Sequence, residues 1–456
     1  MSMFINPLHI PLYDRVDILV AGAGSAGCCA ALAASENRRH SVMLLERYGF
    51  PGGTSTQMLD TFYGFFTPGS NPRKIVGGWP DLVVDELQKT ASIFLRPNTY
   101  GAGTGVNYNP ERLKRVWDML ILRQGIRYLL HTTLIDVIPE NEGYTCIFWT
   151  KGGFGKVMAR RVIDATGDAD FSHLAGFECE IAGESEPAQS MTTTFRMSNV
   201  DLEEYKKAGG KKKLVSQMKD AVARGRHALP RKEGSAHEMN ARGCISTVAV
   251  KVAGHSGLSA ADLTRAEVEG RRQAFAYEDF FRQEMPGFGN SDIIGLSTQI
   301  GVRETRRVYG EHRLTKAECM AAEIGADSIL LCGAPIEDHR MDPENGEETH
   351  WEYIPGSGIY GVPYGCIVPR GSVSAWVVGR CFSATHDAHA SCRSMAQTMA
   401  MGQAAGFAAV RSLETDEAAK DISVLALRET LFSRGAVLEI PGKTADTRRD
   451  GWSANR

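Results

Sequence analysis

The distribution of hydrophobic residues predicts a strand–turn–helix–strand unit close to the N-terminus. Residues 16–21 (VDILVA) form an apolar run that ends at a glycine turn, as expected of a buried parallel strand. Residues 28–35 (CCAALAAS) are small and helix-forming, and residues 41–45 (SVMLL) form a second buried strand that ends at Glu46. About thirty residues in this order are typical of a single βαβ unit.

Similar periodicities continue along the chain. They predict a helix over residues 110–125 and strands over residues 127–137, 145–150 and 161–165. The hydrophobic pattern changes in the middle third of the chain. After it, the pattern of the N-terminal part returns, with a predicted strand at residues 373–378 and a long helix, rich in Ala, Gly and Met, at residues 395–413. This return predicts a sheet domain that an insertion interrupts and the C-terminal third completes.

The middle third alternates short strand-like runs with charged stretches. Strands are predicted at residues 191–197, 245–252 and 292–299, and helices at residues 260–283 and 303–309. Two strongly polar stretches, residues 206–213 (KKAGGKKK) and 337–350 (EDHRMDPENGEETH), predict exposed loops. A lysine run can bind an anion, but a solvated surface is the more common outcome.

Composition narrows the class of protein. Hydrophobic residues make up 43% and charged residues 23% of the 456 residues, which is ordinary for a globular chain. The 51 basic and 54 acidic residues give a net charge of −3, which argues against nucleic-acid and polybasic membrane-surface proteins. Ten cysteines are too few for a disulfide framework, and no stretch predicts a clean transmembrane span. A cytoplasmic location is therefore expected.

Glycines mark the strongest chemical signal, GAGSAG at residues 22–27. It follows the first predicted strand and opens the first helix, and Glu46 lies 24 residues after Gly22 at the end of the next strand. This context is the dinucleotide-binding fingerprint. Gly22 permits the tight turn, Gly24 lets the backbone approach a pyrophosphate, and Gly27 lets the helix and strand pack closely. The helix N-terminus attracts phosphates, and Glu46 can accept hydrogen bonds from ribose hydroxyls.

Three further stretches favour FAD over NAD. ERYGFPGGTST at residues 46–56 has paired glycines, which suit a chain that passes tightly over an extended cofactor. IDATGD at residues 163–168 resembles a strand-end motif of large flavoproteins, and GQAAG at residues 402–406 suits a helix aimed at a flavin ring. A second G-x-G-x-x-G match, at residues 356–361, lies between prolines and predicts a loop. No second dinucleotide domain is visible.

These stretches together resemble the FAD-dependent oxidoreductase family of the glutathione-reductase-like flavoproteins. Residues 301–315 (GVRETRRVYGEHRLT) and 362–406 add to the resemblance, which spans most of the chain. It implies an α/β fold, with a Rossmann-like FAD-binding domain formed by residues 1–185 and 362–456. Residues 186–361 are expected to form an inserted α+β substrate domain built on a mixed sheet. Members often carry Arg where this chain has Gly365, which puts a substrate role for that position in doubt.

The resemblance also implies where each cofactor-binding residue lies. Gly22, Gly24, Ser25, Ala26 and Gly27 would hold the pyrophosphate, and Glu46, Arg47 and the backbone of Leu134 would hold the adenosine side. Gly53, Thr54 and Ser55 would follow the ribityl chain and ring, and Thr166 and Gly167 would close over the cofactor. Arg380 would lie near the phosphates or ribityl chain, and Thr398 near the pyrimidine end of the flavin. A helix N-terminus near Met395 would stabilise negative charge on the reduced ring.

Catalytic candidates lie just before that helix. His386 and His389 are predicted to stand in a loop, where a neutral imidazole could act as general base. Two alternatives stay open: a histidine that only holds its loop, or an H-x-x-H metal ligand pair, although no carboxylate–histidine cluster completes a metal site. Arg393, and Arg303, Arg306 and Arg307 in the middle third, could orient a substrate carboxylate or carbonyl. Three arginines on one short predicted helix more often form salt bridges at the surface or between domains.

The function predicted from these features is that of an enzyme. The leading hypothesis is an FAD-dependent dehydrogenase or oxidase that transfers hydride from a small organic substrate to flavin N5, with oxygen or another acceptor reoxidising the flavin. The alternative is an NAD(P)H-using flavin monooxygenase, and a third is a protein in which FAD is structural and serves a partner. A small-molecule substrate is expected, without nucleic acid, membrane or metal.

Overall fold

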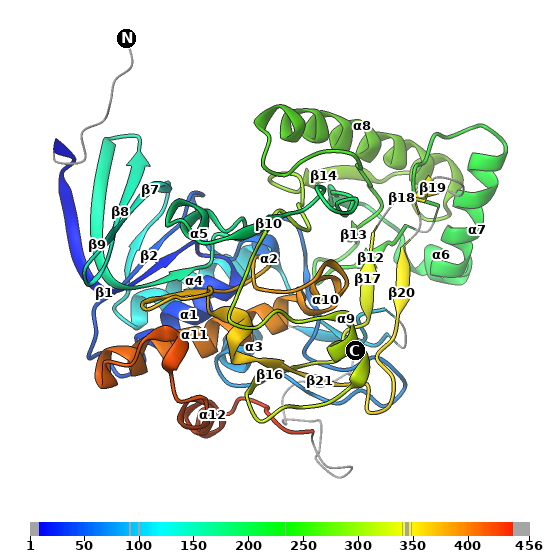
Figure 1. Cartoon of the computed structure of the whole chain (residues 1–456). Helices are drawn as coiled ribbons and strands as arrows, with labels where there is room; N and C mark the ends of the chain where they lie inside the picture. The colour runs from blue at the N-terminus through cyan, green and yellow to red at the C-terminus, as the bar shows by residue number, and fades with distance from the viewer. Residues whose placement is uncertain are drawn as a thin grey trace.

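The computed structural model describes residues 9–440 apart from 91–92, 99–100, 233, 340, 343–345 and 348. Its main element is a seven-stranded sheet that combines parallel and antiparallel pairing (Figure 1). The strand order is β6 (Arg127–Leu129), β2 (Val42–Leu45), β1 (Leu12–Ala21), β9 (Gly153–Asp164), β8 (Gly143–Thr150) and β7 (Thr133–Glu140), and β22 (Ala375–Val377) also pairs with β9. Pairing of β6, β2, β1, β9 and β22 is parallel, whereas β7, β8 and β9 pair antiparallel.

The register brings the carboxyl ends of the parallel strands to one edge of this sheet. Ala21 pairs with both Leu45 and Asp164, Leu45 pairs with Leu129, and Asp164 pairs with Val377. Ligands of open α/β sheets bind in the crevice outside the carboxyl ends of the strands. The predicted Rossmann-type fold is therefore present, and its binding edge is defined.

Small residues bring two helices close together beneath the sheet. Helix α1 (Ser25–Ala34) follows β1, and α11 (Met395–Thr415) packs beside it although it lies far away in the sequence (Figure 1). A Cβ atom at Gly402 would lie 2.0 Å from the carbonyl oxygen of Ala26. Only glycine allows this approach, and the resulting contact joins the N-terminal and C-terminal thirds of the chain.

Alternate residues of β1 face two different cores. Ile18 and Val20 pack against the helical side, whereas Leu19 and Ala21 pack against β7, β8 and α5 (Asp170–Leu174). The helical side is completed by α3 (Trp79–Thr90), α4 (Pro110–Arg123) and α12 (Val424–Ser433). Burial of both faces explains why the sequence of this strand is almost continuously apolar.

A second sheet lies in the middle third and is antiparallel. Its order is β12 (His237–Glu238), β13 (Ile245–Thr247), β11 (Phe195–Ser198) and β14 (Asp292–Leu296), packed with α6 (Leu202–Lys207), α7 (Gly210–Ala223) and α8 (Ala260–Glu284). A mixed sheet was expected here, but the described strands of this region pair antiparallel throughout. Antiparallel strands need no crossover to return along the same sheet, and one face can remain open to a ligand.

This second sheet is anchored to the dinucleotide-binding part by two hydrogen bonds. The Thr194 hydroxyl donates to the carbonyl oxygen of Met58 at 2.7 Å, and the Thr298 N–H donates to that of Gln57 at 3.0 Å. Gln57 ends α2 (Thr54–Gln57), which follows the paired glycines. The two parts of the chain thus meet at the loop predicted to run along FAD.

The lysine-rich stretch at residues 206–213 is helical, so the prediction of an exposed loop was wrong. Asp201 caps α6 by accepting a hydrogen bond from the Glu204 N–H, and Gly209, with φ of +109°, joins α6 to α7. Leu214 and Met218 then bury one face of α7 in the second core. The lysines belong to the polar ends of two amphipathic helices.

The segment predicted as a helix at residues 303–309 contains a strand instead. Strand β15 (Arg306–Val308) pairs antiparallel with β10 (Cys179–Ile181). Arg307 is 2% exposed, and its guanidinium donates to Glu180 at 2.9 Å and also to Glu304. Pairing with β10, which is distant in the sequence, and the two carboxylates around Arg307 favour a strand here, although the local sequence pattern favours a helix.

Short elements complete the described structure. They are β3 (Thr61–Phe62), β4 (Phe94–Arg96), β5 (Gly105–Asn107), β16 (Ser328–Cys332), β17 (Ile336–Asp338), β18 (Met341–Asp342), β19 (Gly346–Glu347), β20 (His350–Glu352), β21 (Tyr360–Pro363), α9 (Lys316–Ala321), α10 (His386–Cys392), η2 (Tyr364–Ile367) and η3 (Ala419–Asp421). Within the described ranges, no helix has the length and apolarity needed to cross a bilayer. The three-part division at residues 185 and 361 stays a prediction, and residues 1–8 and 441–456 lie outside the described part.

Candidate functional site

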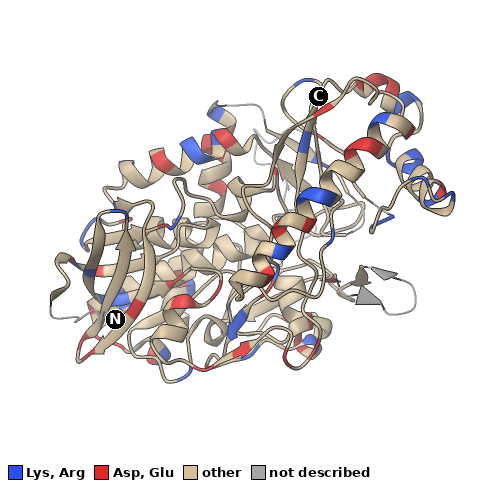
Figure 2. Cartoon of the chain, turned by 90° about the horizontal axis from the view of Figure 1, so that it is seen from above, with Lys and Arg blue, Asp and Glu red and all other residues tan. Residues whose placement is uncertain are grey.

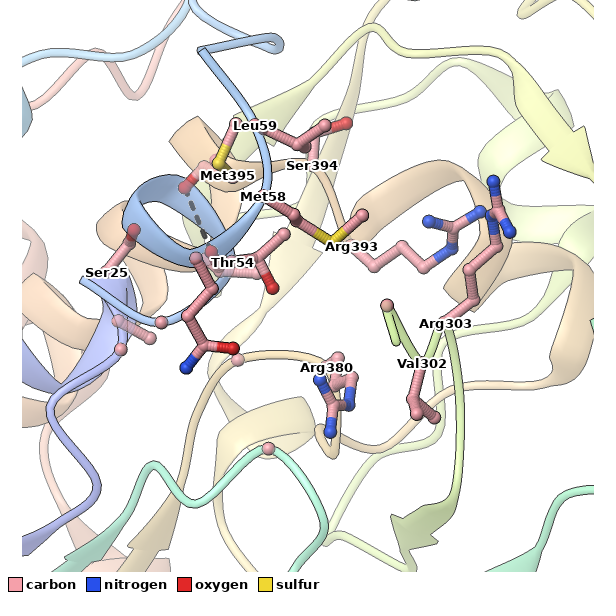
Figure 3. Close-up of a pocket in the computed structure, with 18 of the residues that line it drawn as sticks. Ser25, Thr54, Met58, Leu59, Val302, Arg303, Arg380, Arg393, Ser394 and Met395 are labelled. Atoms are coloured by element: carbon pink, nitrogen blue, oxygen red, sulfur yellow. Dashed lines mark hydrogen bonds between the residues drawn. The ribbon is translucent and has the colours of Figure 1, made fainter. Parts of the chain in front are cut away.

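A cavity of about 730 Å³ opens at the carboxyl edge of the main sheet and extends toward the second sheet (Figure 3). Its lining includes every predicted cofactor-binding residue except Gly27 and Ser55: Gly22, Gly24, Ser25, Ala26, Glu46, Arg47, Gly53, Thr54, Leu134, Thr166, Gly167, Arg380 and Thr398. The volume lies within the range of roughly 300–1,000 Å³ that is usual for ligand pockets. Residues from six separate sequence regions therefore share one space.

The three glycines of the first loop serve different purposes. Gly22 has φ of +97°, and a Cβ there would lie 2.5 Å from the carbonyl oxygen of Ala165. A Cβ at Gly27 would lie 1.9 Å from the oxygen of Gly22, so Gly27 packs inside the unit and does not reach the cavity. A Cβ at Gly24 would meet no atom within 4 Å. The open space at Gly24, beside the N-terminus of α1, fits the pyrophosphate of a dinucleotide.

Ser55 lies behind the cavity wall and fixes the paired-glycine loop through hydrogen bonds. It is fully buried, and its hydroxyl donates to the carbonyl oxygen of Gly52 at 2.7 Å. The Ser25 hydroxyl lies 3.0 Å from the Ser55 hydroxyl, and the N–H of Gly52 donates to the oxygen of Ala23 at 2.7 Å. These bonds fasten the paired-glycine loop to the GAGSAG loop, so Ser55 positions the residues that line the cavity.

Glu46 follows the end of β2, beside the GAGSAG loop. One carboxylate oxygen accepts the Ala23 N–H at 2.8 Å, and the other accepts the Tyr48 N–H at 2.9 Å. Burial raises the pKa of Glu46 above its ordinary value, although these two N–H groups act in the opposite direction. The carboxylate is thereby fixed at the cavity wall, where Leu134 of β7 also lies.

The IDATGD stretch forms a loop that two aspartates organise. Asp164, at the end of β9, accepts hydrogen bonds from the hydroxyls of Thr166 and Ser172, each at 2.7 Å. Gly167 has φ of +80°, and its α-carbon lies close to the Arg380 guanidinium. This arrangement keeps the backbone of Thr166 and Gly167 at the cavity surface.

Asp168 holds the arginines of the cofactor end in place. It is ion-paired with Arg380, and its other oxygen lies 3.6 Å from Arg47. The Thr305 hydroxyl also donates to it at 3.0 Å. Burial opposes ionisation, but Arg380 and Arg47 hold the pKa of Asp168 below its ordinary value. Asp168 was not a predicted site residue, although its place in IDATGD was a usable signal.

The N-terminus of α11 meets the cavity as expected. Ser394, Met395 and Thr398 line it, and the Thr398 hydroxyl donates to the oxygen of Met395 at 2.9 Å. In Figure 3, Ser394 and Met395 stand across the cavity from Val302 and Arg303. A helix N-terminus at this point can stabilise negative charge on a bound ring.

His386 and His389 do not line the cavity. They lie in the short helix α10, where a loop was predicted, and both rings are buried. The Nδ1 of His386 lies 3.2 Å from Glu304 Oε2, and its Nε2 lies 3.2 Å from Asp338 Oδ1. Burial disfavours the cation, but the two carboxylates outweigh it and raise the pKa of His386 to about 10. A protonated ring whose two nitrogens each face a carboxylate has no free lone pair for a substrate proton.

His389 makes a hydrogen bond with the backbone of Arg380, a residue that lines the cavity. Its Nε2–H donates to the carbonyl oxygen of Arg380 at 2.7 Å, and its ring stacks on Phe382. Burial lowers the pKa of His389 to about 3, so the ring is neutral. Within the described ranges, no group of three His, Cys, Asp or Glu is arranged for a metal ion. The general-base hypothesis stays a prediction, but the geometry favours a positioning role for both histidines.

The charge on His386 makes the stability of the chain dependent on pH. Because its folded pKa of about 10 exceeds the ordinary 6.5, its contribution is complete below pH 6.5 and is lost as the pH rises through 10. We expect urea unfolding of wild type and of His386→Gln to show a stability difference that shrinks across this window. A difference that stays constant with pH would show that His386 is not protonated in the folded state.

The far end of the cavity contains residues that sequence reasoning missed. Glu337 and His339 line it although their stretch was predicted as an exposed loop, and their side chains are 2.9 Å apart. Burial acts against the charge on Glu337, but His339, Arg393 and Arg303 lower its pKa to about 2. Arg393 also donates to Gln189 at 2.9 Å. In Figure 3, Arg393 and Arg303 extend toward the same part of the cavity.

Further missed residues come from isolated positions in the sequence. They include Met58, Tyr63, Arg96, Lys211, Arg231, His237 and Trp351. None belongs to a recognisable motif, and the lysine run that contains Lys211 was predicted to be a solvated loop. Their association arises from tertiary structure.

Gly365 lies outside the cavity lining. A Cβ there would lie 2.8 Å from the backbone nitrogen of His312, which donates a hydrogen bond to the Gly365 oxygen at 3.1 Å. An arginine at this position would require the backbone around His312 to move. This chain therefore uses the position for backbone packing.

Comparison with known proteins agrees with this geometry. The profile of the family described as FAD dependent oxidoreductase matches residues 17–431. No curated protein shows significant sequence similarity to the chain. The fold resembles a geranylgeranyl bacteriochlorophyll reductase-like protein from Thermoplasma acidophilum, with 14% identity, 92% of this chain and 83% of that chain covered, and a TM-score of 0.46.

Two other solved structures are similar to the same extent. The flavin-dependent brominase Bmp2 has 12% identity, covering 92% of this chain and 84% of its own, with a TM-score of 0.48. The p-nitrophenol 4-monooxygenase of Pseudomonas putida DLL-E4 has 10% identity, covering 92% and 85%, with a TM-score of 0.44. From the family match over most of its length, the chain belongs to the FAD dependent oxidoreductases, and FAD is its cofactor.

Proposed function

We propose that this oxidoreductase oxidises a small organic molecule bound in the part of the cavity beyond the N-terminus of α11. The observation that supports this is the continuity of the cavity: the space lined by Gly24 and Glu46 continues to Met58, Val302 and Arg393 (Figure 3). Residues that fit FAD occupy one end, and the other end offers a second lined space. The chemistry that bound FAD would supply is that of a hydride acceptor for such a molecule, with oxygen or another acceptor taking up the electrons.

The chain contributes binding, orientation and electrostatics. The first turn of α11 lines the cavity through Met395 and Thr398, and the positive end of a helix dipole favours developing negative charge nearby. Met58 and Val302 present apolar side chains to the cavity. Arg393 presents a planar guanidinium whose position is set by Gln189 and by the carbonyl oxygen of Glu337. Such a group can orient a carboxylate or carbonyl of the substrate.

Anaerobic stopped-flow measurement of flavin absorbance tests this proposal. A panel of small organic acids, alcohols and amines should contain compounds that bleach the flavin in the absence of NAD(P)H. If only NAD(P)H bleaches it, and a substrate accelerates that reaction and becomes oxygenated, the chain is a monooxygenase. A flavin that no substrate or reductant changes would favour a structural role for FAD.

Replacing Arg393 with Gln should slow reduction of the flavin by an active substrate by roughly a hundredfold, because the substrate loses its orienting group. FAD content should stay unchanged, since the phosphate loop lies at the other end of the cavity. Arg370→Gln is the matched control: its side chain is 63% exposed and lies outside the cavity lining. Equal reduction rates in both variants would contradict the role of Arg393.

A further inference from the structure

Strand β17 directs two neighbouring carboxylates to opposite sides, because successive side chains of a strand alternate. Asp338 lies 3.2 Å from Nε2 of His386, which does not line the cavity, whereas Glu337 does line it. The partner strand β20 sets Trp351 directly opposite Glu337, and Trp351 lines the cavity as well. Pairing of the two strands therefore places a carboxylate and an indole ring side by side on one wall of the cavity.

The Glu337 carboxylate is held in place by a neutral partner. One of its oxygens lies 2.9 Å from Nε2 of His339, and Nδ1 of the same ring lies 3.1 Å from the Thr349 hydroxyl. Burial lowers the pKa of His339 to about 3, so the ring is neutral and supplies only a hydrogen bond. The Glu337 side chain is 30% exposed, so its carboxylate is oriented and still open to a ligand.

The indole of Trp351 is fixed beside this carboxylate. Residues opposite each other in an antiparallel pair have Cβ atoms about 4.5–5.5 Å apart. A Cβ at Gly101 would lie 3.2 Å from Cη2 of Trp351, so the ring packs against the Gly101 backbone, which also lines the cavity. A carboxylate attracts a cation, and the face of an indole adds to that attraction. This wall therefore suits an ammonium group of a ligand.

Arg393 lies next to Glu337 and is also anchored by neutral oxygens. Its Nη2 donates to the carbonyl oxygen of Glu337 at 3.2 Å and to the side chain of Gln189 at 2.9 Å. The Gln189 N–H donates in turn to Glu304 at 2.7 Å. Nε of Arg393 is buried and has no hydrogen-bond partner among the described residues. The guanidinium is thus oriented by its neighbours and keeps its positive charge.

Glu337 and Arg393 therefore carry opposite charges side by side without pairing. The hydrogen bond between them uses the backbone oxygen of Glu337, and no ion pair joins their two side chains, both of which the structure describes. Along α8, where acidic and basic residues are interspersed (Figure 2), neighbouring charges do pair, as Arg272 does with Glu269 at 2.7 Å. Two anchored charges of opposite sign that do not pair suit a ligand that carries the complement of both.

The groups around Glu337 keep its carboxylate ionised at neutral pH. Burial opposes ionisation, but His339, Arg393 and Arg303 lower the pKa of Glu337 to about 2. Arg303 donates to the carbonyl oxygen of Ser190 and extends toward the same part of the cavity as Arg393 (Figure 3). An anionic group of a ligand at Arg393 therefore has guanidinium groups beside it and not only the Glu337 carboxylate.

We infer that the substrate is a small zwitterion, an organic acid that also carries an ammonium group, such as an amino acid. Its ammonium group lies between Glu337 and Trp351, and its carboxylate lies against Arg393. This inference rests on the proposed function and names the chemical class of the substrate. A simple acid or a simple amine would satisfy only one of the two charges that the fold holds apart.

Anaerobic isothermal titration of the FAD-loaded protein tests the inference without requiring turnover. Three matched sets of probes differ in size, and each contains a zwitterion, the acid that lacks its ammonium group and the amine that lacks its carboxylate. They are β-alanine, propionate and ethylamine; leucine, 4-methylpentanoate and 3-methylbutylamine; and phenylalanine, 3-phenylpropanoate and 2-phenylethylamine.

In at least one set, the zwitterion should bind at least about tenfold more tightly than both the acid and the amine. The inference is overturned if, in every set, the zwitterion binds no more tightly than its acid or its amine. It is equally overturned if no probe of any set binds.

Two variants should change these affinities in different ways. Glu337→Gln should weaken binding of the zwitterion about tenfold and should not weaken binding of the acid. Arg393→Gln should weaken binding of the zwitterion and of the acid about tenfold and should not weaken binding of the amine. A general loosening of the wall would weaken all three probes together. Equal losses for the three probes, or no loss in either variant, would refute the assignment.

A third variant and a control keep the test independent of the two charges. Trp351→Leu leaves both charges in place and should weaken binding of the zwitterion and of the amine about threefold. Glu352→Gln is the matched control, because Glu352 follows Trp351 on β20 but pairs with Lys316 at 2.5 Å and lies outside the cavity lining. Its affinities for all probes should equal those of wild type.

The two proposals fail in different ways. Preferential binding of a zwitterion that depends on Glu337, together with a flavin that no organic molecule reduces, would sink the proposed oxidation and leave the binding site standing. Reduction of the flavin by alcohols or simple acids, with no preference for a zwitterion, would sink the inference and leave the proposed oxidation standing.

Discussion

Replacing Gly24 with Glu should give a folded protein that contains no FAD. A Cβ at Gly24 meets no atom within 4 Å, so the backbone of the loop has room for a side chain. That room is the space beside the N-terminus of α1, where the pyrophosphate would bind. A carboxylate there repels the phosphates, which costs several kcal/mol and weakens binding at least about a hundredfold. The ratio of flavin to protein absorbance after purification measures this.

Two further glycine variants separate loss of FAD from loss of the fold. Gly289→Glu introduces the same carboxylate at an exposed glycine that also has open space around its Cβ, and it should keep its FAD. Gly27→Val should fail to fold properly, because its Cβ would lie 1.9 Å from the oxygen of Gly22. If Gly24→Glu is purified with a full complement of flavin, the phosphate loop is assigned incorrectly.

Replacing His386 with Ala should destabilise the chain by about 3–5 kcal/mol. The imidazolium lies between Glu304 and Asp338, whose side chains are fully buried, and its removal leaves two carboxylates without the cation between them. These residues join the segment before β15 and strand β17 to helix α10, so their loss also loosens the wall that carries Arg393. Urea unfolding monitored by circular dichroism measures the change in free energy.

His312→Ala is the control for this prediction. His312 is also paired with a carboxylate, Glu318 at 2.6 Å, but both side chains are 40% exposed. The loss of an exposed pair should cost only about 0–1 kcal/mol. The hypothesis of a general base predicts a different pattern for His386→Ala, with unchanged stability and flavin content but reduction at least about a hundredfold slower. That pattern would rule out the positioning role.

Local sequence patterns predicted the dinucleotide-binding part well. The apolar run at residues 16–21 lies within β1, the predicted helix at residues 110–125 corresponds to α4, and residues 395–413 lie in α11. Each of these elements is buried along most of its length or has one clear apolar face, so its hydrophobic period is strong. All predicted cofactor-binding residues except Gly27 and Ser55 share a cavity, because they lie at strand ends or in motifs that such a fold brings to one edge.

The middle third was predicted less well, for a physical reason. The stretches at residues 206–213 and 303–309 were misassigned because each depends on distant partners: a second hydrophobic core for the first, and β10 with two buried carboxylates for the second. Short charged segments carry little periodicity, so tertiary contacts decide their conformation. The same reason explains why His386 was predicted in an accessible loop: no local pattern reveals Glu304 and Asp338 around its ring.

The sequence by itself determined the class of cofactor and the strand–turn–helix unit that binds it. Those features depend on glycines and an acidic residue at fixed spacing within about thirty residues, and local backbone geometry requires them there. Only the tertiary structure decided which other side chains line the same cavity. Arg96, Lys211 and Arg231 come from three separate segments of the chain, and Arg393 from a fourth. Their proximity arises because two sheets and their helices bury separate cores against one cavity, and no short stretch of sequence encodes that contact.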